Sequence, residues 1–403
     1  MIKKQKGFHL LYLIILIAVV GLIIFIGMTV MHKSGGVGNI LSSQPEGGGS
    51  GPNYKALASC SDQPFLDTVP TTLTDYDQIV PLGTINTPDH TQPTDHMYFA
   101  FKHPDQNSVT HPDLLAPGNI VITRIMHSGE KLKGVQMTDD YALTFSACKG
   151  VYFVFGHVQT LGGKLKEAVA SKNLDSSCDR RQPAAGEETF YCMNDTDIKL
   201  SAGDLLGKVG GKPQLGAFDL GAHKNGYKDP GYVSSTYVTN MDAVCPLDFF
   251  TTSAKDQMYQ LIQRTAAPRC GVIGQDKAGT LQGGWYAVKD PKQAEGDWNS
   301  HLSLVHNNLD PAVGILGVGG KITSPATYAF TPVHSGTINR EPGETSAGTT
   351  YCYQFDNQSV RISNAGTGKI LLQLTDNLNL KAEHKDGACT TGESFSNPIN
   401  YYR

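Results

Sequence analysis

A single uncharged and strongly apolar run near the N-terminus constrains this chain more than any other feature. The run is LLYLIILIAVVGLIIFIGMTVM, residues 10–31. As an α-helix it would span about 33 Å, because each helical residue rises 1.5 Å, and the hydrocarbon core of a bilayer is about 30 Å thick. A buried helix of a soluble domain is rarely apolar on every face. The sequence therefore predicts a transmembrane helix over residues 10–31.

The residues around this run indicate how the chain is oriented. A cleaved secretory signal has an apolar core of roughly 7–15 residues before a small-residue cleavage site. This run is longer and no Ala-x-Ala-like site follows it, so we expect an uncleaved anchor. Lys3, Lys4 and Lys6 precede the run and only Lys33 follows it closely. By the positive-inside rule, the basic leader 1–9 is cytoplasmic and everything after the run is extracytoplasmic.

The start of the chain also carries a processing motif. The segment KGFHLLYLIILIAVVGLI resembles the N-terminus of type IV prepilins, in which a basic leader ends in Gly before Phe and an apolar helix follows. Gly7 and Phe8 stand at the matching positions. The family usually has Glu at the fifth mature position, where this chain has Tyr12. The resemblance implies cleavage after Gly7 and, as one alternative function, a minor pilin-like component.

Eight cysteines agree with an extracytoplasmic location, because thiols outside the cytoplasm are commonly paired and an even count permits complete pairing. No Cys-x-x-Cys is present, so we do not expect a thiolate zinc cluster. Proximity along the chain predicts the pairs Cys178 with Cys192, Cys245 with Cys270, and Cys352 with Cys389, which leaves Cys60 and Cys148.

Composition and charge bound the remaining segments. Residues 32–55 are rich in Gly and Ser, cannot bury enough apolar surface to fold, and are expected to form a flexible linker. Without the four lysines that flank the run, the chain carries 29 basic against 37 acidic residues, a net charge of −8. We therefore expect no nucleic-acid partner.

Short apolar stretches separated by turn residues predict a mainly β ectodomain. In residues 56–250 they are HMYFAF, NIVITRI, YALTF, VYFVFGHV, GDLLGKVG and GAFDLG. Residues 161–197 interrupt the pattern and are expected to form a cysteine-containing insertion. A connecting segment, 251–320, is expected to include a helical patch over 255–264. TYAFTPV, TYCYQF, SVRIS, KILLQLTD and NLKAEH predict a separate small β-barrel or sandwich in residues 321–403.

Three pieces between residues 80 and 225 resemble the lysostaphin-type (LytM-like, duplicated hybrid motif) zinc endopeptidases of bacterial cell walls. In that family an early His-x-x-x-Asp gives two zinc ligands, an aromatic-x-His-Leu strand gives a catalytic His, and a late His-x-His gives the third ligand and another catalytic His. VYFVFGHVQTL followed by LSAGDLLGKVGG is similar to the middle piece. The resemblance implies a lysostaphin-like antiparallel β domain in which His157 is catalytic.

The early and late pieces depart from the family pattern. DHTQPTDHMYF has no His four residues before Asp95 but offers His90 and His96. GAFDLG stands in the place of the His-x-His strand and contains no histidine. Ala217 and Asp219 lie two residues apart, so they face the same side of a strand, and Asp219 is the only ionisable side chain there.

These departures leave alternative functions open. If His90, His96 and Asp219 bind zinc, with His157 beside them for proton transfer, the chain is a zinc-dependent endopeptidase-type peptidoglycan hydrolase with altered ligands. His223 is a weaker candidate ligand. If the chemistry is lost, the domain binds peptidoglycan or an envelope protein. We expect a membrane-anchored, single-pass, extracytoplasmic envelope protein, first as such a binding module and alternatively as the hydrolase.

Overall fold

The computed structural model describes residues 57–61, 63–102, 111–172, 178–182, 185–210, 216–360, 362 and 364–403. The chain divides into two units, Met1–Ser43 and Gln44–Arg403, and every described residue belongs to the second. The expected leader, transmembrane helix, Gly7 cleavage site and linker lie outside the described residues. Within the described ranges, no helix combines the length and the apolar character that a membrane span requires.

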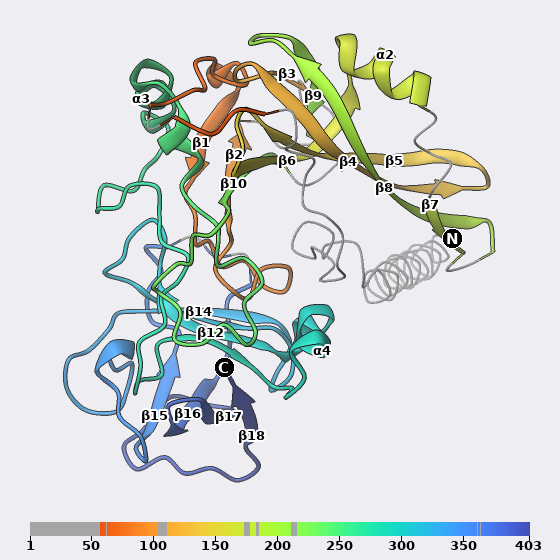
Figure 1. Cartoon of the computed structure of the whole chain (residues 1–403). Helices are drawn as coiled ribbons and strands as arrows, with labels where there is room; N and C mark the ends of the chain where they lie inside the picture. Colours follow the sequence, from red (N-terminus) through yellow and green to blue (C-terminus); the bar gives the residue numbers. More distant parts are fainter. Residues whose placement is uncertain are drawn as a thin grey trace, which may run out of the picture. The chain divides into compact units, whose positions relative to one another are not determined.

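Ten antiparallel strands of the N-terminal half form the first sheet (Figure 1). They are β1 (Tyr76–Val80), β2 (His96–Phe101), β3 (Asp113–Leu115), β4 (Ile120–Leu132), β5 (Val135–Ser146), β6 (Val151–Leu161), β7 (Cys178–Arg181), β8 (Glu187–Leu200), β9 (Leu205–Val209) and β10 (Ala217–Lys224). The order is β1-β2-β10-β6-β5-β4-β8-β7, and β9 pairs with both β3 and β6. Strand β10 therefore lies between β2 and β6.

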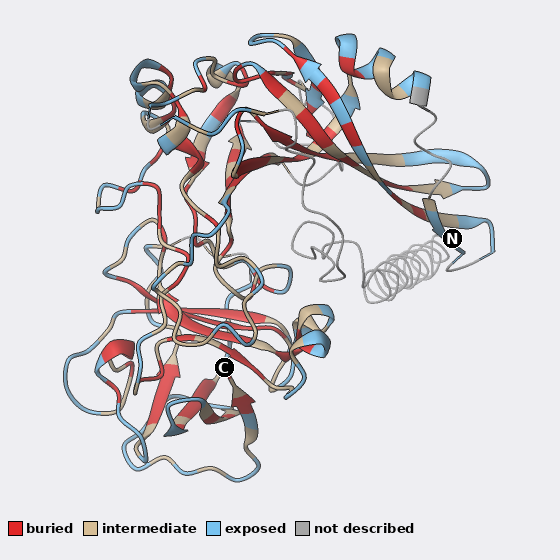
Figure 2. Cartoon of the chain, in the orientation of Figure 1, coloured by how far each residue is buried: buried red, intermediate tan, exposed pale blue. Residues whose placement is uncertain are grey.

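One face of this sheet carries its hydrophobic core. In β10 the alternate residues Phe218, Leu220 and Ala222 are fully buried, as a period of two requires. They join a core that includes Phe99 and Phe155 from the neighbouring strands. Figure 2 shows the buried stretches running along the strands of both sheets. Asp219, between two core residues of β10, consequently belongs to the opposite face.

Among the described residues, three helices and several short 3-10 turns accompany the sheets. The helices are α2 (Gly163–Lys172), α3 (Thr252–Tyr259) and α4 (Pro291–Gly296), and the 3-10 turns are Leu73–Asp75, Pro246–Phe249, Trp298–Ser300 and Pro342–Glu344. Helix α3 buries Met258 in the core of the first sheet. The helix expected over 255–264 therefore exists, but it begins and ends earlier.

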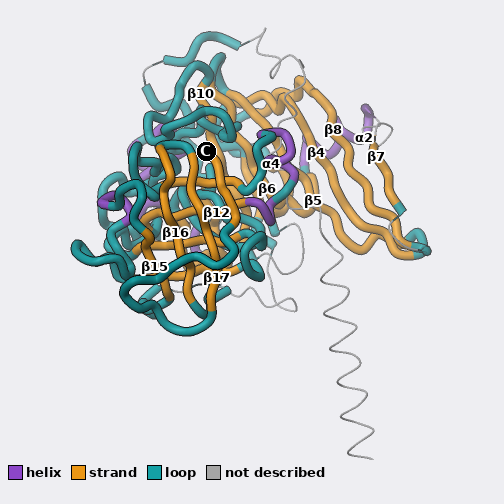
Figure 3. The backbone as a smooth tube through the Cα atoms, turned by 90° about the horizontal axis from the view of Figure 1, so that it is seen from below, coloured by secondary structure: helices purple, strands orange, loops and turns teal. Residues whose placement is uncertain are grey.

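Eight antiparallel strands of the C-terminal half form a second, barrel-like sheet (Figure 3). They are β11 (Gly283–Tyr286), β12 (His301–His306), β13 (Gly314–Val318), β14 (Ala326–Phe330), β15 (Thr350–Gln354), β16 (Lys369–Asp376), β17 (Asn379–Lys385) and β18 (Ile399–Tyr402), in the order β14-β13-β12-β11-β18-β17-β16-β15. The two end strands approach each other, with the rings of Phe330 and Tyr353 5.1 Å apart. The mainly β fold is confirmed.

The second sheet begins before the boundary expected at residue 321. Its strands β11, β12 and β13 lie in the range expected to connect two domains. The sequences of β11 (GGWY) and β13 (GILGV) are short and contain glycine. They lack a clear alternating pattern, because nearly every residue in them is buried. In contrast, the strand expected at SVRIS is wrong for its described residues 359, 360 and 362.

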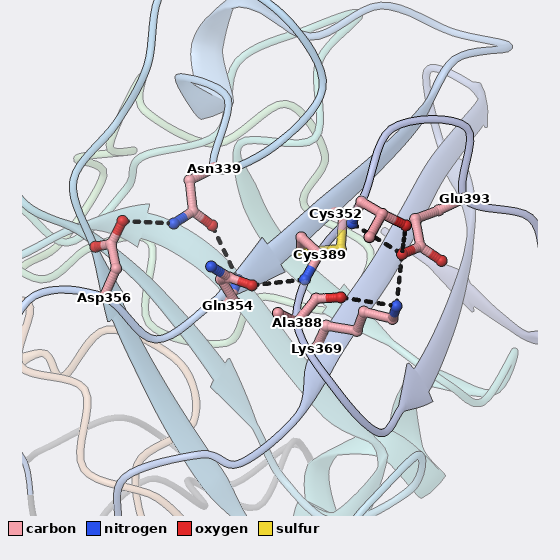
Figure 4. Close-up of a disulfide and its surroundings, with 9 residues drawn as sticks. Asn339, Cys352, Gln354, Asp356, Lys369, Ala388, Cys389 and Glu393 are labelled. Carbon is pink, nitrogen blue, oxygen red and sulfur yellow. Dashed lines mark hydrogen bonds and ion pairs between the residues drawn. A yellow bond between two sulfur atoms is a disulfide. The ribbon is translucent and has the colours of Figure 1, made fainter.

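All four expected disulfides are confirmed: Cys60–Cys148, Cys178–Cys192, Cys245–Cys270 and Cys352–Cys389. Figure 4 shows how the last one ties the loop after β17 to β15. The Gln354 side chain accepts a hydrogen bond from the backbone N–H of Cys389 at 2.6 Å. Lys369 donates to the Ala388 carbonyl at 3.0 Å and pairs with Glu393.

Candidate functional site

Strand register brings the predicted site residues of the first sheet onto three neighbouring strands. Asp219 of β10 pairs with Tyr98 of β2 on one side and with Gly156 of β6 on the other. His96 lies two residues before Tyr98, so both side chains are on the face of β2 that carries Asp219. The sheet thus gathers groups that are more than 120 positions apart in the sequence.

His157 reaches this face through an irregularity in β6. The register between β5 and β6 shifts between Tyr141 and Leu143, and His157 has a φ of 60°. A non-glycine residue in this region costs about 1–3 kcal/mol and persists only where its surroundings hold it. Two carboxylates contact the His157 ring in this conformation. Its Nδ1 lies 2.9 Å from Asp140 Oδ2, and its Nε2 lies 3.2 Å from Asp219 Oδ2. Bulges of this kind often direct side chains at functional sites.

His96 has a similar pair of contacts. Its Nδ1 donates to Asp95 Oδ1 at 2.8 Å, and Asp95 Oδ2 accepts a second hydrogen bond, 3.0 Å long, from the Asn240 amide. The His96 Nε2 lies 3.7 Å from Asp219 Oδ2 and 3.0 Å from the Tyr98 hydroxyl. Both His96 and His157 therefore direct Nε2 to one carboxylate oxygen while a separate carboxylate holds Nδ1.

His90 completes the cluster from a loop. Its backbone exchanges two hydrogen bonds of 2.8 Å with Asn86, which fixes the turn that presents the ring. The ring centroid lies 5.4 Å from that of His96 and 6.0 Å from that of Tyr98. The four predicted residues His90, His96, His157 and Asp219 accordingly meet in space.

Burial, the nearby carboxylates and the neighbouring histidines together set the pKa values of the three histidines in this cluster. Burial alone would lower the pKa of His157, but the Asp219 and Asp140 carboxylates outweigh it and raise the pKa to about 10. The pKa of His96 is also raised, because Asp219 and Asp95 outweigh its burial. Burial and the charge of His96 lower the pKa of His90 to about 4, so this imidazole is neutral at neutral pH and keeps a lone pair.

Asp219 is the centre of the arrangement. Burial alone would raise its pKa, but the charges of His157 and His96 outweigh burial and lower it. The residue is 3% exposed, and neither carboxylate oxygen accepts a well-aligned hydrogen bond from the described residues. A buried carboxylate with such unused acceptor capacity is a place where a cation or a substrate group can be bound.

The donor groups fit zinc in chemical kind. Zinc binds imidazole nitrogen and carboxylate oxygen, and histidine ligands usually give their second N–H to a carboxylate, as His96 does to Asp95. Across the described residues, no group of three or more His, Cys, Asp or Glu side chains is placed so that it would hold a metal ion. The Tyr98 hydroxyl lies against His96 Nε2, so a cation bound there would require this hydroxyl to turn away.

Several residues of the cluster were missed in the sequence. Asp95 directly precedes His96 and Tyr98 lies two residues after it, but Asp140 and Asn240 reach the site only through the fold. His223 lies inside β10 rather than after it, donates to Asp242 through Nδ1 at 2.9 Å and stacks on Tyr152. A carboxylate against the Nδ1 atoms of His96, His157 and His223 is a pattern that the linear sequence does not display.

Comparison with known proteins finds no family model, no curated protein and no solved structure that matches this chain.

Proposed function

We propose that this chain is a metal-dependent hydrolase of the cell envelope, in which His90, His96 and Asp219 would hold a zinc ion once the Tyr98 hydroxyl turns away from His96 Nε2, and His157 transfers protons. One observation carries the proposal: these four residues meet, and the Nε2 atoms of His96 and His157 face the same oxygen of Asp219 at 3.7 and 3.2 Å. Zinc, when bound, polarises a carbonyl and lowers the pKa of water to about 7.

The protein residues have distinct tasks in this reaction. Water adds to the carbonyl carbon of an amide, the C–N bond breaks, and the products are a carboxylate and an amine. His157 would give its Nε2 proton to the leaving amine and regain a proton from the attacking water, while Asp140 keeps the orientation of the ring through Nδ1. Asp95 does the same for His96, and Asn240 in turn orients Asp95.

Charge balance supports the same proposal. With its pKa raised to about 10, His157 is an imidazolium at neutral pH and balances the charge of the buried Asp219 carboxylate. Its Nε2 therefore carries the proton that a leaving amine needs.

The proposed location follows from the N-terminal run and from the disulfides. We place the N-terminus in the cytoplasm and Gln44–Arg403 outside it, held to the membrane by residues 10–31. All four disulfides lie in this second unit, and such bonds persist in oxidising compartments. The substrate proposed from the lysostaphin-type resemblance is the peptide of peptidoglycan.

A non-catalytic module that binds peptidoglycan or an envelope protein is the second candidate. The contact between the Tyr98 hydroxyl and His96 Nε2 favours it, because it covers a nitrogen that a zinc ligand would need. The absence of a histidine from GAFDLG points the same way. In this case the histidine and carboxylate cluster is a charged, hydrogen-bonded element of a substrate-binding face.

Digestion of purified peptidoglycan by the full chain separates the two candidates. The hydrolase predicts new free amino groups that appear with zinc, vanish with a chelator and return when zinc is restored. His157→Asn is the matched variant, since Asn tolerates a positive φ better than most residues. Pull-down of peptidoglycan without release of amines, at any zinc concentration, would instead support the binding module.

A further inference from the structure

The loop that carries His90 joins β1 to β2 of the first sheet, but several of its hydrogen bonds run to the second sheet. Ser303 of β12 donates from Oγ to the Thr91 carbonyl at 2.6 Å. The Gln92 amide donates to the Leu302 carbonyl of the same strand at 3.0 Å. These two bonds fall on the residues that directly follow His90, so they bear on the position of its ring.

The other side of the loop is held in the same way. The Thr87 hydroxyl lies 3.0 Å from the Thr327 hydroxyl of β14, and Asn364 donates to the Thr87 carbonyl at 2.5 Å. Asn308, in the loop after β12, donates to Thr84 Oγ1 at 2.6 Å. His90 is thus bracketed by attachments to the second sheet on both sides.

The attached surfaces are buried and closely fitted. Thr91 is 2% exposed and Ser303 is fully buried. A Cβ at Gly317 of β13 would lie 3.2 Å from the Thr91 carbonyl oxygen, and a Cβ at Gly284 of β11 would lie 2.5 Å from the Gln92 side-chain oxygen. Glycine at these two positions lets the loop approach the sheet closely. The close contact leaves the loop little room to move.

We propose that the second sheet positions His90 for zinc, with Ser303 and Gln92 as positioning residues that act through His90. This inference rests on the proposed function. His96 and Asp219 belong to the first sheet, whereas His90 depends on the second. The site is then built across both sheets, and the C-terminal half of the chain is required for the geometry of the zinc ligands.

The test measures the zinc affinity of the full chain by competition with a chromogenic chelator. Ser303→Ala and Gln92→Ala should each weaken binding by about 10–100-fold, as loss of groups that orient ligands does. Gln373→Ala is the matched control, because Gln373 donates to the Gly348 carbonyl elsewhere in the same sheet. In a His90→Ala background, Ser303→Ala should cause no further loss.

An unchanged zinc affinity in Ser303→Ala and Gln92→Ala overturns the inference. So does a Ser303→Ala loss of zinc affinity that is as large in the His90→Ala background as in the wild type. Amide hydrogen exchange of residues 84–94 gives a second readout that needs no metal. Faster exchange in Ser303→Ala than in Gln373→Ala supports the attachment, and equal exchange overturns it. If the wild-type chain binds no zinc, the proposed function fails, while the exchange data still decide whether the second sheet holds the loop.

Discussion

His157 Nε2 lies 3.2 Å from Asp219 Oδ2, although His157 is at a strained position of β6 and Asp219 is on the neighbouring strand. Asp219, which stands in the place of the family's His-x-His motif, thus contacts His157, the residue expected to be catalytic.

Replacing His157 by Asn should leave zinc binding within a few fold and lower amide hydrolysis by about 10²–10⁴-fold, the typical contribution of a general acid or base. Zinc titration and release of amines from peptidoglycan, measured on the same preparation, check this. Loss of zinc together with activity would instead make His157 a ligand.

Asp140 should act through His157 rather than on the substrate. Asp140 Oδ2 lies 2.9 Å from His157 Nδ1, and its charge orients the His157 ring and raises the pKa of His157. Asp140→Asn removes this charge, so the pKa of His157 should fall. We expect hydrolysis to fall by about 10–100-fold, with the optimum moved to lower pH. A pH profile of the cleavage rate measures both effects. An unchanged profile with a lower rate would point to a general loss of structure.

The disulfides should differ in their contribution to stability because they close loops of different length. Cys60–Cys148 spans 88 residues and Cys178–Cys192 spans 14. The chain-entropy relation predicts that removing Cys60–Cys148 lowers the free energy of unfolding by about 1.5 kcal/mol more than removing Cys178–Cys192 does. Denaturant unfolding of the two Cys→Ala double variants measures this difference. A larger loss for Cys178→Ala/Cys192→Ala would contradict the expectation.

The His306–Glu341 pair should make stability depend on pH. The hydrogen bond to Glu341, 3.1 Å long, raises the pKa of His306 above 6.5. Burial would raise the pKa of Glu341, but His306 outweighs it and lowers the pKa below 4.5. The contribution of His306 is complete below its unfolded pKa and is lost as pH rises through the folded one, while that of Glu341 is lost as pH falls.

The pair therefore stabilises most between about pH 4.5 and 6.5, by on the order of 1 kcal/mol. Glu341→Gln should lower the free energy of unfolding more at pH 5.5 than at pH 8.5. Denaturant midpoints of wild type and variant at the two pH values measure the difference. An equal loss at both values would mean that the charge of His306 is not involved.

Local pattern predicted much of the fold. HMYFAF and KILLQLTD match β2 and β16 residue for residue, because a short apolar stretch bounded by turn residues was sufficient to indicate each strand. Cysteine proximity gave all four disulfides. The start of the second sheet was not predictable, since its first strand, β11, is only four residues long and begins with two glycines.

The site was only partly visible in the sequence. Residue type and motif order indicated His157 and Asp219, and the strands do bring them together. Asp140 was not predictable, because its contact with His157 depends on the register shift in β6, which no local pattern signals. The attachment of Thr91 to Ser303 likewise joins residues 212 positions apart.

Zinc stoichiometry of the purified full chain, measured after equilibrium dialysis, decides whether His90, His96 and Asp219 form a metal site. We expect one zinc per chain in the wild type, with binding lost in His96→Ala and in Asp219→Asn, which preserves side-chain shape. His334→Ala is the matched control, because the His334 side chain is 74% exposed and lies outside the cluster. A well-folded wild-type chain that remains free of zinc, or variants that bind zinc as well as the wild type, would contradict a zinc site at these residues.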